Sequence, residues 1–253
     1  MAAQHAAQNA GPRIRTGMLQ ALDLWVLHFF NGFAGESFAA DRIIFTLTNN
    51  HLFKTAPFVA AYWWMWFTDL GPRRRDGRYL AFAGLGGAIL AALLSRLVQN
   101  VMWERPRPIH NLDLGINALL GLEEGYLANY SSFPSDNAAM TFAMALGIFM
   151  ASRRLGALAF LWALVVACIP RVYAGFHYPS DILGGAVLGL AVAALVIRSG
   201  LTRRLFEGAL RFQRLSPGLF YAAGFVATYQ VVTFFDATRE LGQKVASLVE
   251  ILL

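Results

Sequence analysis

The sequence has little charge for its length. Charged residues make up 14% of its 253 residues, against about 25% in average soluble domains. Hydrophobic residues make up 57%. A soluble protein of this composition would lack the polar side chains needed to cover its surface. The composition therefore excludes an ordinary soluble domain and favours a membrane protein.

The sequence has a single cysteine and lacks clusters of metal-ligating residues. The single cysteine, Cys168, lies inside an apolar run, so no disulfide can form within the chain. We interpret its thiol as structural. The sequence has no cluster of histidines and carboxylates at metal-ligand spacing, and it predicts neither a metal site nor a cofactor.

Acidic residues are outnumbered by basic ones, 15 to 21, which gives a net charge of +6. In a soluble chain this balance would suggest a nucleic-acid partner. Here the arginines fall in short gaps between apolar runs, a pattern that indicates membrane topology. We therefore expect the lipid bilayer as a partner, and no nucleic acid.

Long apolar runs are what the sequence has in abundance. Six of them span residues 53–69, 79–102, 136–152, 155–171, 179–198 and 217–235. A bilayer crossing takes roughly 20 residues, and backbone hydrogen bonding in lipid forces such segments to be helical. The predicted fold is all-α, a polytopic transmembrane helical bundle with five or six spanning helices.

The two ends of the chain differ from its middle. Residues 1–18 are expected to form a flexible tail, residues 19–235 a membrane-embedded domain, and residues 236–253 an amphipathic helix. Within residues 19–50, apolar side chains recur at helical spacing with polar interruptions. This pattern predicts N-terminal interfacial helices, with a complete first span as the alternative.

The positions of the arginines predict the orientation of the bundle. Three gaps between runs carry them, and all three fall on one face if the spans alternate. They are Arg73, Arg74, Arg75, Arg78, Arg153, Arg154, Arg198, Arg203, Arg204, Arg211 and Arg214. Positive charge marks the cytoplasmic face. In a bacterium, loops 103–135 and 171–178 then face the periplasm from the inner membrane.

These two loops hold a high density of polar groups for so apolar a protein. Ionisable residues at membrane depth are costly and are functional candidates. Arg107 and Arg171 offer planar forks that match phosphate oxygens. Ser135 begins a predicted helix, whose first backbone N–H groups can cradle an anion. His177 precedes the next helix, and Asp181 in its first turn is placed to accept from the imidazole.

Together these motifs resemble the type 2 phosphatidic acid phosphatase superfamily, whose three motifs are K-x6-R-P, P-S-G-H and S-R-x5-H-x3-D. The matching residues are, in order, Arg107, Pro108, Pro134, Ser135, Arg171, His177 and Asp181. The resemblance extends over roughly residues 20–200. It implies a membrane lipid phosphatase that needs no metal.

The resemblance also implies a role for each matching residue. His177 would attack phosphorus and form a phosphohistidine, and Asp181 would orient its ring. Arg107, Arg171 and Ser135 would hold the phosphoryl oxygens and stabilise charge in the transition state.

Three positions depart from the family motifs. Asn100 stands where the family has Lys, Pro170 where it has Ser, and Asn137 where it has the His that protonates the leaving group. An amide supplies no proton at neutral pH, but Asn137 can hydrogen-bond a phosphate or leaving oxygen. Asn100 remains a predicted phosphate-binding residue. Arg96 or Arg105 can replace the positive charge of the family's lysine.

The missing general acid bears on the substrate. General acid catalysis contributes roughly 100- to 10,000-fold, and an alcohol leaving group depends on it. A phosphate monoester, with a second pKa of about 6, leaves more readily. We therefore predict hydrolysis of a lipid pyrophosphate, with undecaprenyl pyrophosphate as the candidate. The alternatives are a lipid phosphotransferase, or a catalytically impaired relative that binds or transports lipid phosphate.

Overall fold

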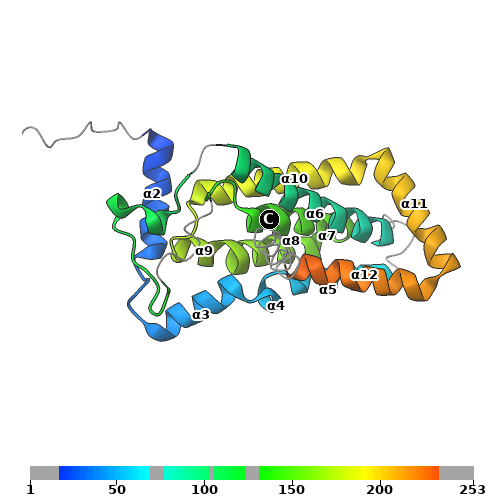
Figure 1. Ribbon diagram of the computed structural model, residues 1–253, viewed down its shortest axis with the longest axis horizontal. Coiled ribbons are helices and arrows are strands. Elements are labelled where there is room, and N and C mark those ends of the chain that lie inside the picture. The colour runs from blue at the N-terminus through cyan, green and yellow to red at the C-terminus, as the bar shows by residue number, and fades with distance from the viewer. Residues whose placement is uncertain (1–16, 69–76, 103–104, 124–130, 234–253) are drawn as a thin grey trace, which may run out of the picture.

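A computed structural model describes residues 17–68, 77–102, 105–123 and 131–233 of the protein (Figure 1). Every regular element within these ranges is a helix, which confirms the all-α class. Two predicted features, the tail and the C-terminal amphipathic helix, lie almost wholly outside the described residues. Arg73, Arg74 and Arg75 also lie outside them.

The helices follow the apolar runs. In chain order they are α2 (Met18–Asn31), α3 (Phe38–Asn49), α4 (His51–Lys54), α5 (Ala56–Phe67), α6 (Gly77–Val101), α7 (Asp136–Ala151), α8 (Arg153–Trp162), the π-helical η3 (Ala163–Cys168), α9 (Ile169–Tyr173), α10 (Pro179–Arg198), α11 (Gly200–Leu215) and α12 (Pro217–Val232). Two short 3-10 turns, η1 (Pro108–His110) and η2 (Leu112–Leu114), lie between α6 and α7. Within the described residues, each of the six predicted runs coincides with one helix or with consecutive helices.

Three stretches of the described chain are long and apolar enough to cross a membrane. They are Gly77–Val101, Arg153–Tyr173 and Pro179–Arg198. Three other apolar helices are shorter than these. Helices α7 and α12 have 16 residues each, and α5 has 12. A bundle embedded in a membrane is thus supported, while the number of five or six spans stays a prediction.

Close packing of α7 against α10 brings the starts of these two helices together. A Cβ atom at Gly185 would collide with the Ser135 carbonyl oxygen, and one at Gly189 with the Ala139 carbonyl oxygen. Small residues at this spacing permit such close contact between membrane helices. The glycines therefore set the separation of the two helix N-termini that carry the polar motifs.

The ends of the bundle are covered by helices that cross it. Figure 1 shows α2 at one end and α11 at the other, with α6, α7 and α10 running between them. The buried face of α2 carries Asp23, Leu27 and Asn31, while Trp25 and Phe29 point outward and are 66% and 56% exposed. Its 14 residues are fewer than a bilayer crossing needs, which supports an interfacial position.

The helix α11 was not predicted from the sequence. We interpreted its arginines as marks of a connecting gap, but they lie on an amphipathic helix whose Phe206 is buried. Helical periodicity was present in this segment, and the density of arginines obscured it.

Candidate active site

The three motif stretches meet at the end of the bundle that α2 covers. The backbone N–H of Ser135 donates to the Asp181 carbonyl at 3.0 Å, and that of Ser132 to the Arg105 carbonyl at 2.9 Å. From α6, the Gln99 side chain donates to the Pro134 carbonyl at 2.7 Å. Residues distant in sequence thus form one site, as the motifs predict.

His177 lies at the centre of this site and is fully buried. Its Nδ1 is 2.9 Å from the carbonyl oxygen of Ser132, and its Nε2 is 3.3 Å from Arg107 Nη1. A carbonyl oxygen can only accept, so Nδ1 carries the proton and Nε2 keeps its lone pair. The ring therefore presents a basic nitrogen toward a guanidinium group.

Asp181 is a neighbour of the imidazole rather than its hydrogen-bond acceptor. Its Oδ2 is 3.6 Å from His177 Nδ1, beyond hydrogen-bond range, and instead accepts from the Tyr178 backbone N–H at 2.8 Å. Its Oδ1 pairs with Arg105. The geometry corrects our expectation on this point: the Ser132 carbonyl orients the ring, and Asp181 places a negative charge beside it.

Burial and charge lower the pKa of His177. Burial is the largest cause, the charge of Arg107 adds to it, and Asp181 opposes both, so that the pKa falls to about 4. The imidazole is consequently neutral at neutral pH. A neutral imidazole is the form that can attack phosphorus.

Two buried arginines flank the histidine. Arg107 and Arg171 are 5% and 7% exposed. Burial, and then the charge of Arg171, lower the pKa of Arg107 to about 10, so it stays protonated at neutral pH. Arg107 Nη1 donates to the Phe176 carbonyl at 2.8 Å, and its Nε has no hydrogen-bond partner among the described residues. A buried guanidinium with an unused donor is suited to an anionic ligand.

The start of α7 supplies the second motif. Ser135 is buried and caps the helix, its Oγ accepting from the Ala138 N–H at 3.4 Å. Asp136 pairs with Arg96 at 2.6 Å and accepts from the Asn137 side-chain amide at 2.8 Å. The Asn137 Oδ1 is buried and has no hydrogen-bond partner among the described residues. The side chain therefore keeps a spare hydrogen-bond acceptor at this position, and it has no acidic proton to give to a leaving group.

Two of the predicted phosphate-binding residues, Asn100 and Arg105, are not buried as Arg107 and Arg171 are. Asn100 is exposed, whereas its neighbour Gln99 is buried and reaches the 131–135 loop. Arg105 pairs with Asp23 at 3.1 Å and lies 4.0 Å from the centre of the Tyr178 ring. The guanidinium of Arg105 is thus engaged by carboxylates and an aromatic face, and that of Arg96 is paired with Asp136.

Asp23 is a site residue that none of the sequence motifs indicates. It reaches from α2 to the start of α10, where its Oδ1 accepts from the Ser180 N–H at 2.7 Å and its Oδ2 from the Ser180 Oγ at 2.6 Å. In the sequence, this aspartate is one of the polar interruptions of the apolar pattern in residues 19–50. The usable signal was an acidic residue on the helix face opposite the exposed Trp25 and Phe29.

Comparison with protein families finds a match that contains the whole site except Asp23. The model of the PAP2 superfamily matches residues 81–205. This range covers the cluster from Arg96 to Asp181, together with α7, α10 and α6 from residue 81 onward.

Three curated proteins are similar to this chain at modest identity. The "Bacitracin transport permease protein BcrC" of Bacillus licheniformis is 26% identical over 69% of this chain and 79% of its own length. The "Undecaprenyl-diphosphatase BcrC" of Bacillus subtilis (strain 168) is 23% identical over 66% and 79%. The "Putative undecaprenyl-diphosphatase YbjG" of Escherichia coli (strain K12) is 28% identical over 69% and 82%.

Proposed function

Because the chain carries a PAP2 superfamily region at residues 81–205, we infer that it is a membrane lipid phosphatase. We propose that it hydrolyses a lipid pyrophosphate, with undecaprenyl pyrophosphate as the substrate, at the periplasmic face of a bacterial inner membrane. The observation that carries the proposal is the buried, neutral His177, whose Nε2 faces Arg107.

The first chemical step uses the lone pair of His177 Nε2. Nε2 attacks the terminal phosphorus, a P–N bond forms, and the P–O bond to the lipid phosphate breaks with its electron pair on the leaving oxygen. The ring becomes positive, and its Nδ1–H remains donated to the Ser132 carbonyl beside the Asp181 carboxylate. That carboxylate stabilises the developing imidazolium.

The second step regenerates the imidazole. Water attacks the phosphorus, the P–N bond breaks, and its electrons return to Nε2. The proton of the attacking water passes to a phosphoryl oxygen, so inorganic phosphate leaves protonated. Atoms and charge balance without a metal.

The phosphoryl group would bind where the buried donors converge. Arg107 contributes its unused Nε–H, Arg171 a second guanidinium, and Ser135 its hydroxyl at the start of α7. Preorganised donors of this kind act most strongly in a buried site with little water. Binding a phosphate there would also neutralise two like charges that are costly to bury together.

The substrate assignment rests on Asn137. Because this residue offers no acidic proton, the leaving group must depart without protonation, as a phosphate monoester can. One curated relative is named "Undecaprenyl-diphosphatase" and another "Putative undecaprenyl-diphosphatase", which supports the same substrate class.

A second candidate function is lipid-phosphate binding or transport without turnover. The name of one relative as a transport permease favours it, as does the loss of the family's general acid at Asn137. A phosphotransferase differs from the proposed hydrolase only in its acceptor, and it would yield a phosphorylated product in place of inorganic phosphate.

Phosphate release from purified protein tests these functions. Wild type, His177→Ala and the matched control His28→Ala, which alters an exposed histidine on α2, are each given undecaprenyl pyrophosphate or phosphatidic acid. We expect wild type and the control to act equally, and faster on the pyrophosphate. Faster release from phosphatidic acid would refute the substrate class, and no release above His177→Ala from either lipid would refute the enzyme.

A further inference from the structure

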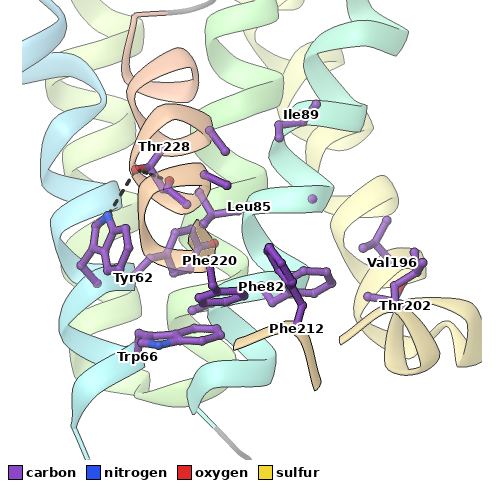
Figure 2. A pocket seen from close by; sticks show the side chains of 17 residues that line it. Tyr62, Trp66, Phe82, Leu85, Ile89, Val196, Thr202, Phe212, Phe220 and Thr228 are labelled. Atoms are coloured by element: carbon purple, nitrogen blue, oxygen red, sulfur yellow. Dashed lines mark hydrogen bonds between the residues drawn. The ribbon is translucent and has the colours of Figure 1, made fainter. Parts of the chain in front are cut away.

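A cavity lies far from the candidate active site. It has a volume of about 550 Å³ and lies between α5, α6, α11 and α12 (Figure 2). On α6 it is lined by residues of the first half, including Leu85. At 1.5 Å per residue, Leu85 is roughly 21 Å along the helix from Gln99 in the active site. The cavity is therefore a separate feature of the molecule.

The interior of this cavity offers hydrocarbon to a ligand. Its polar side chains are largely engaged within the protein, since the Tyr62 hydroxyl donates to the Met144 carbonyl at 2.8 Å. Thr228 Oγ1 donates to the Gly224 carbonyl at 2.9 Å and accepts from Trp63 at 3.3 Å. The rest of the lining is almost entirely apolar. A pocket of this size and character fits an acyl chain.

One edge of the cavity carries an unused donor and positive charge. Trp66 lines the cavity, is 8% exposed, and its indole N–H has no hydrogen-bond partner among the described residues. The Arg78 guanidinium lies 5.9 Å from the centre of the Trp66 ring. Outside the lining, the guanidinium of Arg203 on α11 lies 5.2 Å from the centre of the Tyr79 ring. Tryptophan and arginine at such an edge are typical of residues that meet lipid headgroups.

The helix α11 adds further charge at the same end of the bundle. Its Thr202, Leu205 and Phe212 line the cavity, and it also exposes Arg204 and Arg211. A basic amphipathic helix of this kind attracts anionic lipids at a membrane surface. Apolar lining and positive charge thus occur on one element.

We propose that this cavity binds one acyl chain of an anionic phospholipid. The headgroup would lie against the arginines of α11. The bound chain would fill the space between α12 and α6 and join them. This lipid is not the substrate, and its site does not depend on the phosphatase reaction.

Gly86 gives a matched pair of variants for testing the site. A Cβ atom at this position meets no atom within 4 Å, so a side chain there enters open space. Gly86→Leu fills part of the cavity, whereas Gly86→Ala leaves most of it open. Both replacements raise helix propensity in α6, so a difference between them reports on the cavity.

The experiment measures lipid retained by the delipidated full chain, using native mass spectrometry with added phosphatidylglycerol or phosphatidylcholine. We expect wild type, Gly86→Ala and the inactive His177→Ala to retain one phosphatidylglycerol. Gly86→Leu is expected to bind it about tenfold more weakly, a loss of about 1.4 kcal/mol. Arg204→Gln combined with Arg211→Gln is expected to reduce the preference for phosphatidylglycerol over phosphatidylcholine.

Three results would overturn the proposal. One is equal retention of phosphatidylglycerol by Gly86→Leu and Gly86→Ala, which would show that the cavity is not the site. Another is equal retention of the two phospholipids by wild type. The third is displacement of the retained lipid by a polyprenyl phosphate in wild type but not in Gly86→Leu, which would assign the cavity to the substrate's own chain.

Discussion

At the scale of single residues, His177 combines full burial with a polar neighbour at each ring nitrogen. The Ser132 carbonyl holds Nδ1–H at 2.9 Å, and Arg107 lies 3.3 Å from Nε2. The same guanidinium that would bind the phosphate also helps to keep the nucleophile unprotonated. The contact between Arg107 and His177 therefore couples phosphate binding to activation of the nucleophile.

The lowered pKa of His177 predicts activity in mildly acidic solution. Protonation removes the nucleophile, and because the pKa is depressed to about 4, kcat/KM should persist below pH 6 and fall as the pH drops through about 4. An ordinary imidazole would lose activity near its usual pKa of about 6.5. The measurement is kcat/KM against pH for two substrates of different phosphate pKa. A shared acidic limb near pH 6.5 would contradict the prediction.

The same shift predicts a loss of stability in acid. The pKa of His177 is lower in the folded protein than in the unfolded chain, so the neutral ring stabilises the fold. This stabilisation is fully present at pH values above the pKa of the histidine in the unfolded chain. That contribution is lost as the pH falls from about 6.5 to about 4. The thermal midpoint should fall more over this window in wild type than in His177→Asn, a neutral replacement.

Replacing Asn137 by histidine should restore a general acid. Phosphatidic acid, whose alcohol leaving group needs a proton, is expected to react about 100-fold faster with Asn137→His than with wild type. Undecaprenyl pyrophosphate should change far less. Initial rates of phosphate release from both lipids give the comparison. An equal gain on both would remove the leaving-group argument for a pyrophosphate.

At the scale of elements, the N-terminus of α10 is held by α2 and by the 105–108 segment. Asp23 accepts two hydrogen bonds from Ser180 and also pairs with Arg105, which in turn pairs with Asp181. This network fixes the first turn of α10, directly after His177. Asp23 is thus a positioning residue that acts through Ser180 and Arg105.

Asp23→Asn should therefore lower kcat more than it changes KM. Asparagine lacks the negative charge that pairs with Arg105 and one of the two oxygens that accept from Ser180, so we expect kcat to fall about tenfold as the start of α10 loosens. Gln20→Ala, an exposed change on the same helix, serves as the control. In a double-variant cycle with Ser180→Ala, additive effects would contradict the positioning role.

The contact between α7 and α10 predicts an effect of added volume. Gly189→Ala places a methyl group against the Ala139 backbone, so α10 must move and the free energy of unfolding should fall by about 1–3 kcal/mol. Gly86→Ala adds the same methyl group to open space on α6 and should not destabilise. Thermal unfolding in one detergent compares the two, and equal midpoints would refute the close packing.

At the scale of the whole molecule, the sequence predicted the helices and the meeting of the motifs better than it predicted their contacts. Apolar runs locate membrane helices because lipid leaves the backbone no alternative. The Ser132 carbonyl and Asp23 were missed because each acts through tertiary packing that no local pattern encodes. Asn100 was placed by motif spacing, but the structure turns Gln99 inward instead. Helical phase, rather than motif position, decides which side chain faces the site.

The orientation proposed for the bundle places η2 and α11 on opposite sides of the membrane. In a Cys168→Ala background, Leu112→Cys, at a residue 94% exposed in η2, should react with a membrane-impermeant maleimide in cells whose inner membrane is intact. Arg204→Cys, on the exposed face of α11, should react only after that membrane is opened. The reverse pattern would place the site in the cytoplasm.

The central claim is that His177 Nε2 forms the bond to phosphorus. The direct measurement is rapid acid-free quenching of enzyme with undecaprenyl pyrophosphate labelled in its terminal phosphate, followed by peptide mapping of the phosphoprotein. The account predicts a label on Nε2 of His177, absent from His177→Ala and lost on longer incubation. Turnover with no labelled protein, or with the label on another residue, would contradict it.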